Sequence, residues 1–181
     1  MRIIPLLVSV FVVSVTSITC TSYGRHQASD VRVVPYVNLN KYAGTWYEIA
    51  RYPNHFQKGC VASTALYTLR DDGKIDVLNQ CRKNTLEGEL LSAKGTAKNV
   101  DKKTNAKLKV TFFWPFSGHY WIIDLGERYE YSVVGHPERK YLWILSRTPE
   151  MDDDLYNQIL VRIKQQGYDV TKLMKTLQAE P

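Results

Sequence analysis

The sequence predicts an all-β domain followed by one α-helix. Short stretches rich in β-branched and aromatic residues recur at near-regular spacing between residues 44 and 146, with turn-forming residues between them. A segment with helical periodicity comes only after the last of them. This order is typical of a β-sandwich or an up-and-down barrel with a helix on its outside, and the pattern alone leaves both architectures open.

Eight strands are expected. The clearest turn between two of them is residues 71–74, where Asp-Asp-Gly-Lys favours a tight hairpin. Residues 114–118 are expected to form another turn, with Trp-Pro-Phe at its tip. The strands are expected over residues 44–52, 61–69, 74–81, 90–98, 107–113, 119–125, 129–134 and 141–146.

The helix is expected to begin at Thr148 and Pro149, a capping hydroxyl followed by the residue favoured at the first helical position. Ile159 and Ile163 lie four residues apart on one apolar face, and Gly167 is a natural stop. We expect this face to cover the outside of the barrel, because a single domain needs that cover. Binding of a partner protein is the alternative.

Composition limits the classes of protein that the chain can belong to. Its 181 residues suit one domain, and 44% apolar against 23% charged residues allow a packed core. The 12 Tyr, 4 Trp and 5 Phe favour β-structure or a lined cavity. No internal run reaches the roughly 18–20 apolar residues of a membrane-spanning helix. The net charge of +6 is spread along the chain, so nucleic acid is not expected as a partner.

The N-terminus has the pattern of a secretory signal peptide. Arg2 precedes an almost wholly apolar run over residues 3–15, which is short for the alternative, a membrane anchor. Cys20 directly follows this segment and resembles the Cys of the bacterial lipoprotein signal. The resemblance implies lipidation of Cys20 and, because Thr21 and not Asp comes next, sorting to the outer membrane. We therefore expect a signal peptide at 1–19, a lipidated N-terminus and linker at 20–37, and the domain at 38–181.

The chain has two further cysteines, Cys60 and Cys81. If Cys20 carries lipid, these two remain as a pair in an oxidising compartment, where a disulfide is allowed. Two buried thiols are the alternative.

Alternation along the expected strands indicates which side chains face inward. Over residues 107–112 polar and apolar side chains alternate strictly, so Leu108, Val110 and Phe112 share the protected face. Over residues 94–98 the lysines fall on one side and the small Gly95 and Ala97 on the other. Charges that point outward argue against a barrel embedded in lipid. Small inward residues favour space for a ligand, and an interior filled by side chains is the alternative.

Residues 40–51, Asn-Lys-Tyr-Ala-Gly-Thr-Trp-Tyr-Glu-Ile-Ala-Arg, resemble the first signature of the lipocalins, with its Gly-x-Trp. Residues 56–60, 72–75 and 141–149 continue the likeness in order, most closely to bacterial lipocalins and their apolipoprotein D-like relatives. The resemblance implies an eight-stranded antiparallel up-and-down barrel, a calyx with one open and one closed end. Gly44 and Trp46 would lie at the closed end, with the guanidinium of Arg147 across the indole.

The resemblance also implies which positions line the cavity. With Trp46 inward, alternation places Glu48 and Ala50 on the same face, and whether Glu48 pairs with a Tyr hydroxyl or turns outward is left open. The wall is mostly apolar and suits one hydrocarbon chain with a small polar head. The expected ligand-binding residues are Ala65, Tyr67, Val77, Asn79, Val110, Phe112, Tyr120, Tyr141 and Trp143.

The function implied by the resemblance is storage or transport of a fatty acid or lysophospholipid at the bacterial outer membrane, on the periplasmic side, in envelope maintenance or stress. The tip at Trp114 and Phe116 would be a lipid entry point there. The four His have no metal-ligand spacing and no catalytic motif is present, so no cofactor, no metal and no enzymatic activity are expected. A lipid isomerase that uses a free Cys81 thiol and a tetrapyrrole carrier are the alternatives, and a homodimer is left open.

Overall fold

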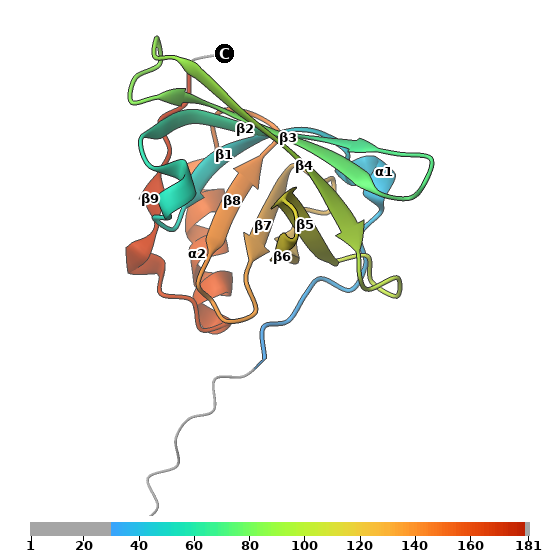
Figure 1. The fold of residues 1–181 in the computed structure, drawn as a ribbon. Helices are drawn as coiled ribbons and strands as arrows, with labels where there is room; N and C mark the ends of the chain where they lie inside the picture. Colours follow the sequence, from blue (N-terminus) through green and yellow to red (C-terminus); the bar gives the residue numbers. More distant parts are fainter. Residues whose placement is uncertain (1–29, 180–181) are drawn as a thin grey trace, which may run out of the picture.

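A computed structural model describes residues 30–179 (Figure 1). It confirms the expected class: a closed eight-stranded antiparallel barrel with one additional short strand and a C-terminal helix. The signal segment and Cys20 lie outside the described residues. The elements are α1 (Leu39–Tyr42), β1 (Gly44–Arg51), η1 (His55–Gln57), β2 (Cys60–Leu69), β3 (Ile75–Lys83), β4 (Leu90–Asn99), β5 (Lys107–Phe113), β6 (Phe116–Leu125), β7 (Tyr131–Gly135), β8 (Leu142–Ser146), α2 (Asp153–Gln165), η2 (Val170–Lys172) and β9 (Met174–Lys175).

Each strand of the barrel pairs with its neighbours in sequence, and β1 closes the sheet by pairing with both β8 and β2. The pairing of β1 with β2 covers only the first half of β1, from Gly44↔Tyr67 to Tyr47↔Thr64. Beyond it, β9 pairs with the second half of β1, and the amide of Ala62 donates to the carbonyl of Leu177. The C-terminal tail thus joins β1 to β2 toward the open end.

The hairpin at residues 71–74 forms as expected. The amide of Arg70 donates to the carbonyl of Lys74, and the Asp72 carboxylate accepts from the Lys74 amide. Gly73 has a φ of +76°, a left-handed conformation that a residue with a Cβ adopts only with strain. The other expected apolar turn is shorter than predicted, because β6 begins at Phe116 and only Trp114 and Pro115 remain between the strands.

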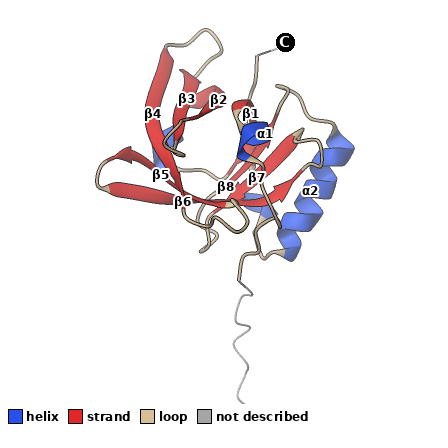
Figure 2. Ribbon diagram, turned by 90° about the vertical axis from the view of Figure 1, so that its right-hand side faces the viewer, coloured by secondary structure: helices blue, strands red, loops and turns tan. Residues whose placement is uncertain are grey.

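The expected start of the helix is wrong. α2 begins at Asp153, and its cap is Asp152, whose carboxylate accepts from the amide of Leu155 at 2.9 Å. Thr148 instead donates its hydroxyl to the carbonyl of Glu150. A carboxylate at the cap also suits the positive end of the helix dipole, so three consecutive aspartates were the better signal. The expected packing is confirmed: α2 lies against the outside of the barrel (Figure 2), and its Ile159 and Ile163 are fully buried there.

The second part of the expected linker 20–37 is packed against the barrel in the structure. Val31 and Val37 are buried, and the amides of Val34 and Val37 donate to the carbonyls of Ile122 and Thr104. Apolar residues in a polar segment bury themselves where the barrel offers a surface, which no local pattern reports. Residues 31–37 are therefore packed against the barrel. No helix among residues 30–179 is long and apolar enough to cross a membrane.

Candidate ligand-binding site

The closed end of the barrel is sealed by Trp46 and Arg147. The indole is completely buried, and the guanidinium carbon lies 3.8 Å from the centre of its ring. Arg147 also donates to backbone carbonyls of residues 41–43 and 45, at 2.7–3.1 Å. Gly44 has a φ of +95°, and a Cβ there would lie 3.4 Å from the guanidinium, so this glycine lets the backbone pass beside Arg147. These contacts give the three residues a structural part at the base.

Four hydroxyls form a connected chain inside the barrel, above this base. The Tyr120 hydroxyl lies 2.9 Å from that of Tyr67 and 2.7 Å from that of Tyr42, which lies 3.0 Å from the hydroxyl of Ser132. Burial raises the pKa of Tyr42 to about 12 and raises the pKa values of Tyr67 and Tyr120 as well. All three phenols therefore stay neutral at pH 7 and keep a hydrogen to donate.

Sequence reasoning missed Tyr42 and Ser132 as members of this group. Tyr42 belongs to α1, a single helical turn ahead of the first strand, and no strand pattern covers it. Its amide donates to the carbonyl of Asn38, and the side chain of Asn38 caps the turn. Ser132 lies on β7 between Tyr131 and Val133, which face α2, so alternation along β7 could have placed it inward.

The inner wall divides into a packed lower half and a more open upper half. Tyr67 and Val77 are buried in a cluster with Trp46 and Leu108. The seven other expected ligand-binding residues are partly exposed, although strand alternation and their packing place them on the inner face or at its rim. These side chains keep surface on the inner face or its rim that a ligand could still cover. These seven are Ala65, Asn79, Val110, Phe112, Tyr120, Tyr141 and Trp143.

Space above Gly95 is smaller than the sequence suggested. A Cβ on Gly95 would lie 2.8 Å from the ring of Phe112 and 2.8 Å from the carbonyl of Thr111. The Phe112 ring therefore occupies the room that the glycine leaves. Small residues on β4 suggest a cavity, but the neighbouring strand β5 supplies a large side chain beside them.

Aromatic rings gather where the lumen opens. Tyr141 and Trp143 are stacked with ring centres 5.8 Å apart, and Phe56, from the loop between β1 and β2, lies 5.7 Å from Tyr141 and 6.3 Å from Trp143. The indole nitrogen of Trp143 donates to the side-chain oxygen of Gln57 at 2.9 Å. Phe56 and Gln57 were not expected site residues, because only the folded loop brings them to β8.

A bulge in β1 corrects the expectation that Ala50 faces the lumen. The register with β8 shifts between Glu48 and Ala50, so Ile49 and Ala50 both join the cluster that contacts α2. Arg51 then takes the inner face opposite Trp143. In a regular strand, residues three apart point to opposite faces, so Glu48 and Arg51 would lie on different faces. The extra residue of the bulge brings Arg51 to the same face as Glu48.

The buried carboxylate of Glu48 therefore pairs with the guanidinium of Arg51 rather than with a Tyr hydroxyl. It also accepts from the side chain of Gln57 at 2.7 Å and from the hydroxyl of Thr176. Arg51 donates in turn to the carbonyls of Gln57 and Cys60. A paired and hydrogen-bonded carboxylate avoids the cost of burying a lone charge. The pair ties the β1–β2 loop and the C-terminal tail to the barrel wall.

Cys60 and Cys81 are joined by a disulfide between β2 and β3, with Cα atoms 5.4 Å apart. The isomerase alternative needs a free thiolate at Cys81, because the thiolate is the nucleophile. In this structure both sulfurs are consumed by the bond. Among residues 30–179, no group of three or more His, Cys, Asp or Glu side chains is placed to hold a metal ion.

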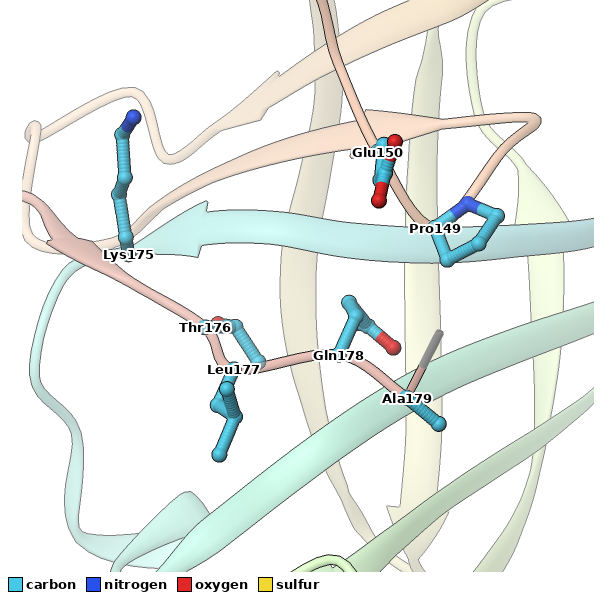
Figure 3. Close-up of a pocket in the computed structure, with 7 residues that line it drawn as sticks. All are labelled: Pro149, Glu150, Lys175, Thr176, Leu177, Gln178 and Ala179. Carbon is cyan, nitrogen blue, oxygen red and sulfur yellow. The ribbon is translucent and has the colours of Figure 1, made fainter. Parts of the chain in front are cut away.

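Two surface features lie outside the lumen. At the β5–β6 tip, Phe113, Trp114 and Phe116 are 78%, 89% and 78% exposed. A groove of about 400 Å³ runs along the C-terminal tail and is lined by residues 149–150 and 175–179 (Figure 3). None of the expected ligand-binding residues lines this groove.

Comparison with known families supplies the identity of the fold. The family model described as a lipocalin-like domain matches residues 37–178. The chain is a lipocalin. It is 38% identical to the outer membrane lipoprotein Blc of Escherichia coli, with 96% of each chain covered. It is 39% identical to temperature-induced lipocalin-1 of Arabidopsis thaliana, over 85% of this lipocalin and 86% of the plant protein.

Solved structures agree with this assignment at the level of fold. Insecticyanin from the tobacco hornworm Manduca sexta superposes with a TM-score of 0.68 at 21% identity, over 83% of this lipocalin and 86% of that chain. Apocrustacyanin C2 gives a TM-score of 0.64 at 20% identity, over 79% and 81%. Lipocalins are in general binding and transport proteins, and the lumen described above is consistent with a hydrophobic ligand.

Proposed function

We propose that this lipocalin binds one fatty acid or lysophospholipid in the upper half of its barrel and carries or stores it. The observation that supports this most directly is the exposure of the inner wall. Tyr67 and Val77 are buried in the cluster around Trp46, whereas the inward side chains of Val110, Phe112, Tyr120 and Trp143 are partly exposed. Burying an acyl chain there would contribute about 0.8 kcal/mol per CH₂, so a long chain supplies most of the affinity.

We place this function at an outer membrane, with the domain on the periplasmic side. Support comes from Cys20 at the end of the signal-like segment and from the relatives named outer membrane lipoprotein. We propose a signal peptide at 1–19, an acylated Cys20, and a linker that ends before Val31. Mass spectrometry of the purified N-terminal peptide tests this, with Cys20→Ser as the control. An unmodified Cys20 in the secreted protein would contradict it.

The exposed β5–β6 tip is proposed as the point of contact with the bilayer surface. The three aromatic rings at the tip are mostly exposed, so they can insert at the level of the lipid headgroups without breaking contacts within the protein. Trp is favoured at that level of a membrane. Lys109, on the same hairpin, adds positive charge that anionic headgroups attract. A ligand could then pass between the bilayer and the lumen without crossing water.

The test is a titration of the lipid-stripped protein with palmitic acid and with a palmitoyl lysophospholipid, each below its aggregation concentration. Saturable micromolar or tighter binding with a change in tryptophan emission is expected. Trp143→Phe should abolish most of the emission change, because Trp143 lies at the lumen. Trp121→Phe is the matched control: this indole lies under the Lys107 ammonium at 4.3 Å, away from the lumen. Absence of binding by both lipids would overturn the proposal, and visible absorbance of the purified protein would favour a tetrapyrrole.

A further inference from the structure

The hydroxyl groups at the floor of the lumen carry one more hydrogen than their hydrogen bonds to one another require. Four hydroxyls, those of Tyr67, Tyr120, Tyr42 and Ser132, make three contacts with one another in a row. Each hydroxyl brings one hydrogen, and each contact consumes one. Within the part of the chain that the structure describes, one hydroxyl hydrogen is therefore left without an acceptor in this chain.

Exposure indicates where that hydrogen is available to a ligand. Tyr67 is 5%, Tyr42 1% and Ser132 0% exposed, whereas Tyr120 is partly exposed and packs against the inward cluster. If Tyr67 and Tyr42 both donate to the Tyr120 oxygen, the Tyr120 hydrogen remains free to point into the lumen. A phenol that accepts two hydrogen bonds and donates one uses its full capacity.

An unpaired acceptor lies close by on the same inner face. The side-chain oxygen of Asn79 is buried and has no hydrogen-bond partner. Asn79 pairs with Ala65, and Val77 pairs with Tyr67, so Asn79 and Tyr67 are diagonal neighbours, about 7–8 Å apart at Cα. A buried polar atom without a partner is costly and calls for an explanation such as a ligand.

We infer that the floor of the lumen is a polar subsite for the buried end of the ligand, and that it takes a neutral hydroxyl. A hydroxyl can accept from Tyr120 and donate to Asn79 at once, which neither a methyl group nor a carboxylate can do. A carboxylate at this depth would also lose its hydration, while the guanidinium of Arg147 at the base is already occupied by the indole and the backbone carbonyls. The preferred ligand is an acyl chain with its charged head at the mouth and a hydroxyl on its far end.

This inference rests on the proposed function, and one pair of ligands separates the two. Palmitic acid and 16-hydroxypalmitic acid are titrated against the lipid-stripped protein by calorimetry. We expect the hydroxylated acid to bind about fivefold to tenfold more tightly, the effect of one well-placed hydrogen bond. Equal or weaker binding of the hydroxylated acid overturns the inference while the proposed function stands. Failure of both acids to bind overturns the proposed function itself.

Variants locate the effect. Tyr120→Phe should reduce the preference to about onefold to twofold, since an ordinary hydrogen bond contributes about 1 kcal/mol. The two hydrogens left unused belong to Tyr67 and to the Tyr42–Ser132 pair, which are buried away from the ligand. Tyr67→Phe is the matched control, because three hydroxyls with two contacts still leave one hydrogen and the Tyr120 hydroxyl in place. Asn79→Leu removes the acceptor by an independent change and should also lower the preference. A preference that survives both Tyr120→Phe and Asn79→Leu would overturn the assignment.

Discussion

The two halves of this barrel are built for different tasks. Around the closed end, Val37, Trp46, Ala106 and Leu108 are completely buried, and Arg147 is held by several carbonyls. Toward the open end, inward side chains are partly exposed and the wall between β1 and β2 is completed by the C-terminal tail. The closed half therefore concentrates folding free energy, and the open half keeps surface that a ligand can still bury.

The largest loss of stability should come from truncating Trp46 at the base of the barrel. Trp46→Ala deletes a fully buried indole and its stacking contact with the guanidinium of Arg147, so we expect a loss of about 3–5 kcal/mol in the free energy of unfolding, measured with urea. Trp143→Ala, at the partly exposed mouth, is the matched substitution and should cost less than half of this. Equal losses at the two sites would contradict the division of the barrel into a stabilising and a binding half.

The disulfide is the main covalent support of the more open half. Its loop spans 21 residues, and replacing Cys60 and Cys81 by Ser should lower the free energy of unfolding by about 3 kcal/mol. Reduction of the unmodified protein should give the same loss, which separates the bond from the substitutions. No change on reduction would mean that the bond does not form in the protein.

The buried phenols predict an alkaline transition. Tyr42 has its pKa raised to about 12 by burial, whereas an unfolded Tyr titrates near 10. The folded pKa is the higher one, so the stabilisation is fully present below pH 10 and is lost as pH rises toward 12. Absorbance of phenolate should show Tyr42, Tyr67 and Tyr120 ionising only with unfolding. Ionisation of all tyrosines before unfolding would count against the buried floor.

The smallest effect on stability is expected at the exposed tip. Trp114→Ala removes a side chain that is 89% exposed, so the free energy of unfolding should change by no more than about 0.5 kcal/mol. Binding to vesicles of anionic phospholipid, measured by co-sedimentation, should nevertheless fall severalfold. Leu177→Ala, an exposed apolar residue of the tail, serves as the control. Unchanged vesicle binding would remove the tip from the proposed membrane contact.

Part of the site could be predicted because strand alternation is local. Along β3 and β5, Val77 and Val110 follow the regular period of two, and the structure places them on the inner face. Along β1 the period breaks at a bulge, so Ala50 faces α2 and Arg51 faces the lumen. A bulge is a property of two paired strands, and one strand's sequence does not reveal it.

The sequence by itself determined the class of fold, the order of the eight strands, the terminal helix and the residues that meet at the base. The hydrophobic period, the turn residues and the lipocalin signatures each depend only on residues close together in the sequence. Only the tertiary structure decided that Phe112 fills the space above Gly95, that Glu48 pairs with Arg51, and that four hydroxyls meet at the floor. Those contacts join residues from different strands, and their partners are fixed by how the barrel closes and packs.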